Sequence, residues 1–236
     1  MENILLKYMV ERFNKHDTEY KIFNTDFPFV TISREYGCPS KDIAELLVQK
    51  INKHLYLKNN AQVWKMISKE ILENTSKELS VDPKRIQKFF DVQNRTTIDE
   101  ILDSLSAKYY QSDKTVKKTL TIVISDFAKK GNVVIVGRGG VCVTNNLKNG
   151  IHIRLKAPLE WRAQKILEAN HIRDIEEAKK LALDIDSKRI ELLKIMSNNC
   201  FNESFFDITY NCKSFNNEEI ADSIIYHLGL KSKIMI

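Results

Sequence analysis

Short apolar runs alternate with helical patterns along most of this 236-residue chain. Residues 29–33 follow Pro28, are rich in β-branched side chains and predict a buried strand. A polar turn over residues 34–40 comes next, and residues 41–53 carry apolar side chains at helical spacing. Strand, turn and helix in this order begin a βαβ unit.

The rest of the chain continues this alternation. We predict a helix at 115–130, strands at 133–136 and 151–155, a helix that opens at Ala157–Glu160, a helix at about 175–197 capped by Asp174 and Glu177, a strand at 206–210 and a closing helix at 217–228. Strands that alternate with helices imply a mostly parallel sheet covered on both faces.

Two segments do not follow the alternation. Residues 3–14 predict an amphipathic helix that either covers the domain or joins two chains, so the choice between monomer and homodimer stays open. Residues 60–112 are polar and helical in pattern, with a helix start at Asp82–Pro83. We expect a helical insert there.

Composition narrows the class of partner. The net charge of +6 favours anionic partners, although a basic solvated surface explains it equally well. The basic residues are scattered without an aromatic-flanked stripe, so nucleic-acid binding is not expected. Four cysteines without a C-x-x-C pair argue against a zinc site and a disulfide framework. Without a signal peptide or an apolar span, we expect a cytoplasmic protein that does not contact membranes.

The first candidate site is the turn after the first predicted strand. Ligands of open α/β sheets bind beyond the carboxyl ends of the strands, where helix N-termini favour phosphate. A Walker motif would need a second Gly followed by Lys and then Ser or Thr, so an ordinary βα turn is the alternative. The turn reads Ser33-Arg34-Glu35-Tyr36-Gly37-Cys38-Pro39-Ser40-Lys41-Asp42.

The second candidate is the turn Gly137-Arg138-Gly139-Gly140. Cys142 stands where a dinucleotide fingerprint needs its third Gly, and the next strand begins too soon for a full crossover helix, so dinucleotide binding is disfavoured. The fork of Arg138 suits a bidentate grip on phosphate or carboxylate. A structural ion pair is the alternative.

A third group lies on the predicted helices. Asp186 and Arg189 are three residues apart and therefore face each other on a helix. The group as a whole indicates either a charged solvated face or a cationic lid over transferring phosphates. Its members are Arg162, Arg173, Asp186, Lys188 and Arg189.

Several segments in register resemble the cytidylate kinase-like family of P-loop kinases. They are VTISREYGCPSKDIAELL, VVIVGRGGVCV, IHIRLKAPLEWRAQKI, DIDSKRIELL and FDITYNCKSFNNEEIADSI, and they span roughly residues 29–228. The resemblance implies an α/β, P-loop NTPase-type three-layer sandwich with a mostly parallel five-stranded sheet. The domain would cover 28–230 after an extension at 1–27, with a nucleotide-binding helical insert at about 55–115 and a lid at about 165–195.

The resemblance also implies an activity, namely transfer of the ATP γ-phosphoryl group to a nucleoside monophosphate such as CMP or dCMP, with Mg²⁺. By position, Gly37 to Lys41 would surround the ATP phosphates, and the segment Ser33–Asp42 would form the cofactor site. Ser40 and Glu35 would lie nearest the metal. Gly137, Arg138 and Gly139 would bind the acceptor, and Lys41, Arg162, Arg173, Asp186 and Arg189 would serve catalysis.

Two departures from the family pattern keep other functions open. Ser40 and Lys41 stand in the reverse of the usual Lys-Ser/Thr order, and Gly139 replaces an Asp that follows Gly-Arg in cytidylate kinases. The alternatives are a non-catalytic nucleotide-binding or regulatory module and a kinase of another small metabolite.

Overall fold

A computed structural model describes residues 27–57, 63–67, 114–170, 172 and 174–232 of the chain. The predicted helix at 3–14 and most of the predicted insert at 60–112 lie outside these residues. Among the described helices, none is both long and apolar enough to cross a membrane.

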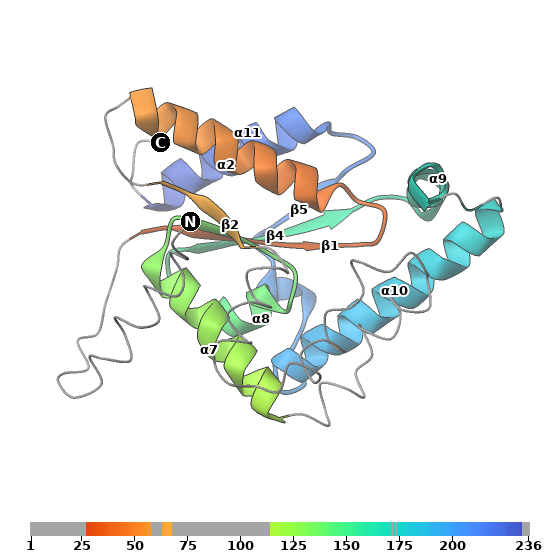
Figure 1. The fold of residues 1–236 in the computed structure, drawn as a ribbon, viewed down its shortest axis with the longest axis horizontal. Coiled ribbons are helices and arrows are strands. Elements are labelled where there is room, and N and C mark those ends of the chain that lie inside the picture. Colours follow the sequence, from red (N-terminus) through yellow and green to blue (C-terminus); the bar gives the residue numbers. More distant parts are fainter. Residues whose placement is uncertain (1–26, 58–62, 68–113, 171, 173, 233–236) are drawn as a thin grey trace, which may run out of the picture.

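The centre of the fold is a parallel sheet of five strands in the order β2-β3-β1-β4-β5. The strands are β1 (Phe29–Arg34), β2 (Lys65–Ile67), β3 (Val133–Val136), β4 (Gly150–Lys156) and β5 (Ile208–Asn211). All four strand pairs are parallel, which confirms the expected α/β class. Because β1 lies between β3 and β4, its carboxyl end lies beside those of two strands from the second half of the chain (Figure 1).

Successive side chains of the central strands enter two different cores. Val30 and Ile32 face one apolar cluster, whereas Phe29 belongs to the other. On β3, Val134 faces the first cluster and Ile135 the second. This period of two, with apolar residues on both sides, is what a parallel sheet covered by helices requires.

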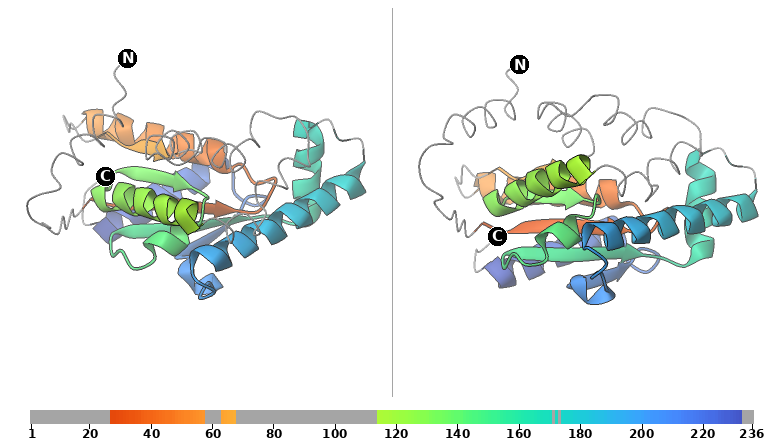
Figure 2. Two further views of the ribbon diagram at one scale, coloured as in Figure 1. Left: turned by 60° about the horizontal axis from the view of Figure 1, so that its bottom comes forward. Right: turned by 90° about the horizontal axis from the view of Figure 1, so that it is seen from below.

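The helices cover both faces of the sheet. The helices α2 (Ser40–Leu57) and α11 (Asn217–Ser232) pack together on one face. The opposite face carries α7 (Lys114–Lys130), the short α8 (Gly140–Thr144) and the C-terminal part of α10 (Ile175–Met196) (Figures 1 and 2). The three-layer arrangement therefore agrees with the sequence pattern.

The helix α9 (Leu159–Asn170) and the N-terminal part of α10 extend beyond the carboxyl end of the sheet (Figure 1). They share an apolar core of their own, separate from both sheet cores, formed by Ala163, Ile166, Ile172, Ala178, Leu181, Ala182 and Ile185. The Asp174 side chain caps α10 as predicted, but it accepts from the N–H of Glu176 at 3.1 Å. An N-cap side chain can accept from the second or the third amide of the helix, here those of Glu176 and Glu177. The observed bond uses the amide of Glu176.

Three elements differ from the sequence prediction. β2 was not predicted, because only three residues pair and only Ile67 is buried. The five-residue helix α8 was not predicted either, since it is too short to show a helical period. β5 begins at Ile208 rather than at 206, because Phe206 turns into an apolar cluster with Val141 and Leu193.

A buried histidine lies in the middle of the sheet. The side chain of His152 on β4 is 5 % exposed, and its Nδ1 lies 2.8 Å from Oγ1 of Thr31 on β1. Burial lowers the pKa of His152 from 6.5 to about 4, although the nearby Asp207 carboxylate opposes the shift. The imidazole is therefore neutral near pH 7.

This pKa predicts that acid weakens the fold. Between pH 6.5 and about pH 4 the unfolded chain binds a proton at His152 that the folded chain excludes. As the pH is lowered through this window, the free energy of unfolding should therefore decrease, by at most about 1.4 kcal/mol per pH unit. Urea denaturation at several pH values measures this slope. In His152→Asn, whose amide can still bond Thr31, the slope should be smaller, and equal slopes would contradict the assignment.

Candidate functional site

The loop between β1 and α2 forms the centre of the candidate site. Arg34 is the last residue of β1, and Ser40 is the first residue of α2. Gly37 in this loop has φ of 91°, and a Cβ built on it would lie 2.9 Å from the carbonyl oxygen of Arg162. Only glycine combines this backbone conformation with such a close approach to α9.

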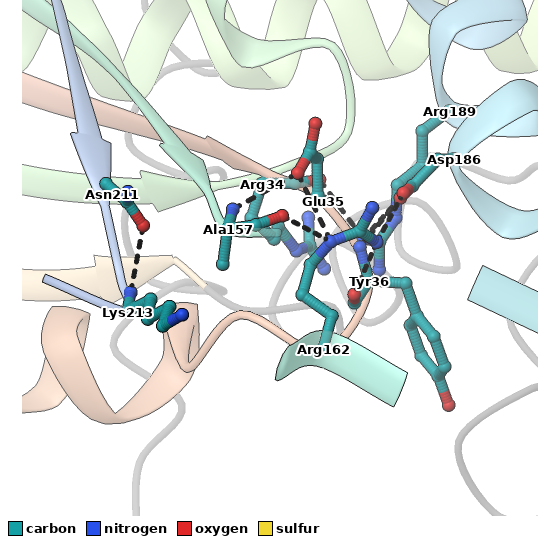
Figure 3. Close-up of polar contacts among 9 residues, drawn as sticks. All are labelled: Arg34, Glu35, Tyr36, Ala157, Arg162, Asp186, Arg189, Asn211 and Lys213. Atoms are coloured by element: carbon teal, nitrogen blue, oxygen red, sulfur yellow. Dashed lines mark hydrogen bonds and ion pairs between the residues drawn. The ribbon is translucent and has the colours of Figure 1, made fainter. Parts of the chain in front are cut away.

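The Asp186 carboxylate on α10 ties this loop to the two helices beyond the sheet. Its Oδ1 accepts the N–H of Tyr36 at 2.7 Å, and its Oδ2 accepts Nη1 of Arg162 at 2.7 Å (Figure 3). Arg189 lies one turn further along α10, with Nη1 3.8 Å from Oδ1. Burial raises the pKa of Asp186, while the Tyr36 amide and the two arginines oppose this shift. The carboxylate therefore depends on these partners to remain charged.

Arg162 on α9 is 5 % exposed and donates to several protein atoms. Its Nε donates to the carbonyl oxygen of Ala157 at 2.9 Å, and Nη1 also lies 2.9 Å from the carbonyl oxygen of Tyr36. Oε2 of Glu35 lies 3.3 Å from Nε and accepts the N–H of Ala157 at 3.2 Å. These contacts support a positioning role for Arg162, and its expected contact with the transferring group stays a prediction.

Three further arginines, Arg34, Arg138 and Arg189, lie beside this ion pair. Burial lowers the pKa of Arg34 well below its ordinary value, and the charges of Arg189 and Arg138 lower it further. Burial also lowers the pKa of Arg189, with Arg138 contributing and Asp186 opposing. Mutual repulsion of buried cations is relieved when an anion binds between them. The cluster is therefore an electrostatically favourable site for a phosphate or carboxylate.

The two sequence turns meet at this cluster. Gly137 has φ of 73°, and a Cβ on it would clash with Nη1 of Arg34, so the guanidinium lies directly over the second turn. Arg189 donates to the carbonyl oxygen of Arg34 at 3.1 Å, and its guanidinium lies 5.5 Å from the ring centre of Tyr36. Arg34 thus lies with the predicted acceptor residues, although its sequence position suggested the cofactor site.

The main-chain amides of the first turn are only partly available to an anion. Those of Glu35, Tyr36, Cys38 and Ser40 donate to Leu155, Asp186, Glu35 and Cys38, respectively. Pro39 has no N–H. Among the described residues nothing accepts from the amides of Gly37, Lys41 and Asp42. The turn therefore offers Gly37 and the N-terminus of the 18-residue α2 to a phosphate, a smaller set than the sequence prediction assumed.

The remaining predicted site residues lie at the edge of the cluster or outside it. The side chain of Lys41 is 76 % exposed and pairs with Glu45 at 3.8 Å, and Ser33 is half-buried at the end of β1. Gly139 packs against the Met196 side chain, so its contact with an acceptor stays a prediction. Arg173 lies outside the described residues.

The structure does not assemble a metal cage from the predicted ligands. No cluster of three or more His, Cys, Asp or Glu suited to a metal occurs in the described part of the chain. Ser40 is 6 % exposed, and one oxygen of Glu35 is already held by Arg162 and Ala157. Protein kinases and ATPases usually hold Mg²⁺ with one or two side chains together with phosphate oxygens. These two residues suit that sparse kind of site.

A pocket of about 740 Å³ lies between the loop after β1, α9 and the segment after β5. The sequence prediction missed most of its lining. Ligands of open sheets bind beyond the carboxyl ends of the strands, and this rule could have indicated the segment that follows β5. The lining residues are Gly37, Pro39, Trp161, Lys165 and residues 212–219. The volume lies in the range of small-molecule sites.

Comparison with known proteins places these features in a family. The model of the Cytidylate kinase-like family matches residues 29–214. A cytidylate kinase of Sulfolobus acidocaldarius is 28 % identical over 145 residues, which cover 61 % of this chain and 78 % of that protein. The crystal structure of an uncharacterized protein from Eubacterium ventriosum superposes with a TM-score of 0.59 at 16 % identity. The superposition covers 86 % of this chain and 98 % of that structure's chain, and it supports the fold.

The Asp186 ion pair should dominate the stability of the loop. Asp186→Ala removes one of the two carboxylates that pair with buried Arg162 and also the acceptor of the Tyr36 amide. It should lower the free energy of unfolding by about 3 kcal/mol, because a buried charge loses its shorter ion pair. Asp184→Ala on the same helix removes an exposed pair with Lys188 (3.2 Å) and should cost less than about 1 kcal/mol. Urea denaturation of both variants decides this, and equal losses would contradict the structural role of Asp186.

Proposed function

The chain belongs to the cytidylate kinase-like family, and on this premise we propose that it transfers the γ-phosphoryl group of ATP to a nucleoside monophosphate, with CMP or dCMP as the first candidate acceptor. The observation that carries the proposal is the gathering of Arg34, Arg138 and Arg189 where β1 and β3 end. Phosphoryl transfer needs cations around the equatorial oxygens more than it needs covalent chemistry.

The acceptor phosphate would lie against Arg34 and Arg138. Both belong to turns at the carboxyl ends of adjacent parallel strands, and Arg34 covers Gly137. A guanidinium keeps its charge and grips a phosphate with two parallel hydrogen bonds. Arg189 approaches from α10 and would neutralise the charge that develops on the moving group.

The donor nucleotide would occupy the opposite side of the loop. Its phosphates would lie at the amides of Gly37, Lys41 and Asp42, where the N-terminus of α2 favours negative charge. Its base and ribose would enter the neighbouring pocket, which contains the aromatic side chains of Trp161 and Phe215.

Mg²⁺ would arrive with the ATP phosphates and neutralise part of their charge. Ser40 at the start of α2 and the second oxygen of Glu35 are the protein groups that would complete its coordination. The positions of both residues beside the phosphate loop support this part of the proposal.

A nucleotide-binding module without transfer activity is the second candidate. It is favoured by the four loop amides that donate within the protein and by the solvent exposure of Lys41. Such a module would bind ATP at the pocket and the helix N-terminus but would release no ADP with any acceptor.

Substitution of the acceptor arginines tests the transferase. Arg138→Ala and Arg34→Ala should each lower the turnover rate by about 10³-fold, because the transition-state charge loses an engaged cation. A coupled ADP-release assay against the common ribo- and deoxyribonucleoside monophosphates measures this. Lys129→Ala, on the exposed face of α7, is the control and should leave the rate unchanged. Wild-type ADP release that no monophosphate stimulates would sink the proposal in favour of the binding module.

The pocket assignment has a test of its own. Phe215→Ala should weaken ATP binding about tenfold, since stacking of a base on an aromatic ring contributes about 1–3 kcal/mol. The free energy of unfolding should change little, because Phe215 is 50 % exposed. Tyr226→Ala removes an aromatic residue of α11 that is 65 % exposed and does not line the pocket. Calorimetric titration with a non-hydrolysable ATP analogue should find its affinity unchanged, and equal effects of the two substitutions would count against the pocket.

A further inference from the structure

Two cysteines from opposite ends of the domain meet beside the pocket. Cys38 lies in the loop after β1, and Cys212 directly follows β5. Both loops start beside neighbouring residues of β4, because the N–H of Glu35 donates to the carbonyl oxygen of Leu155 at 3.0 Å and the N–H of Cys212 donates to that of Lys156 at 2.8 Å. Cys212 is 7 % exposed and belongs to the core cluster against which Cys38 packs.

The two side chains interact with each other. This interaction raises the pKa of Cys38 and lowers that of Cys212. The Cys212 thiol therefore loses its proton more readily than the Cys38 thiol. Cys142 instead donates to the carbonyl oxygen of Leu193 at 3.3 Å, and Cys200 is exposed. Of the four cysteines, all free here, this pair alone is arranged as a dithiol.

We propose that Cys38 and Cys212 form a reversible disulfide that cross-links the loop after β1 to the loop after β5 and narrows the pocket between them. Cys212 lines this pocket together with Gly37 and Pro39, the two neighbours of Cys38 in sequence. An S–S bond is about 2.05 Å long, far shorter than a contact between two thiols, so oxidation must draw the two walls together. The effect on nucleotide binding rests on the function proposed above, whereas the disulfide itself does not.

The chemistry requires a small disulfide or hydroperoxide as oxidant. With a disulfide RSSR, the Cys212 thiolate reaches it through the pocket and attacks one sulfur, which forms a mixed disulfide and releases RS⁻. The Cys38 sulfur, after loss of its proton, then attacks Cys212 and releases the second RS⁻. Two protein thiols are oxidised, RSSR is reduced to two RSH, and an excess of a reducing dithiol reverses both steps.

Thiol mapping of the full-length protein tests the cross-link. After equilibration with oxidised and reduced dithiothreitol, free thiols are alkylated, and the proteolytic peptides are identified by mass spectrometry. We expect loss of two of the four free thiols and one linked peptide pair that contains Cys38 and Cys212. Cys38→Ser and Cys212→Ser should each abolish the pair, while Cys200→Ser, at the exposed cysteine, should retain it. Complete alkylation of both cysteines under oxidising conditions that modify Cys200 would overturn the proposal.

A second measurement follows the pocket without any nucleotide. Trp161 lines the pocket, whereas the second tryptophan, Trp64, is 3 % exposed. Acrylamide quenching of tryptophan fluorescence should therefore decrease on oxidation in the wild type and stay constant in Cys38→Ser. A disulfide that forms without this decrease would refute the narrowing of the pocket.

Nucleotide binding separates this proposal from the proposed function. Oxidation should weaken the binding of a fluorescent ATP analogue about tenfold in the wild type, equivalent to ~1.4 kcal/mol, and not at all in Cys212→Ser. Equal affinity of the oxidised and reduced protein would overturn the regulatory consequence. If the reduced protein bound no ATP analogue, the proposed function would fail, while the peptide map and the quenching would still decide the disulfide.

Discussion

The carboxylate of Asp186 is the contact on which the geometry of the site depends. It accepts the amide of Tyr36 and pairs with Arg162, so one side chain of α10 fixes both the loop after β1 and the start of α9. Desolvation would favour the neutral acid, and only these partners keep the charge in place. The orientation of the loop is therefore set by a side chain of α10, a helix that only partly covers the sheet.

Beyond this ion pair, three arginines gather at one end of the sheet. The charges of Arg189 and Arg138 lower the pKa of Arg34, and the charge of Arg138 also lowers that of Arg189, which means that the three charges repel. A folded protein maintains such a cluster at a cost in stability, and an anionic ligand lowers that cost when it binds. Arg162 differs from these three arginines, because its Nε and Nη1 already donate to Ala157, Tyr36 and Asp186.

The sequence predicts those elements that are long enough to show a hydrophobic pattern of their own. β1, β3 and β4 are buried along most of their length and rich in apolar residues, β3 is a continuous apolar run, and Arg138 stands two residues after its end. β2 has three residues and α8 has five, which is too short for either period to appear. The bond from Tyr36 to Asp186 joins residues 150 positions apart, and the contact of Cys38 with Cys212 spans a similar distance in the chain. No local pattern encodes such pairs, so they become visible only once the sheet order is known.

That sheet order also bears on how the protein is made. β1 ends at Arg34, but its two neighbours begin at Val133 and Gly150, so the central strand has no permanent partner until well over half of the chain has been synthesised. At ribosomal rates of roughly 5–20 residues per second, several seconds separate its emergence from its pairing. Throughout this interval Val30 and Ile32 form part of an apolar segment with open hydrogen-bonding edges, the kind of segment that chaperones bind. The strand that organises the finished site is thus also the most vulnerable part of the nascent chain.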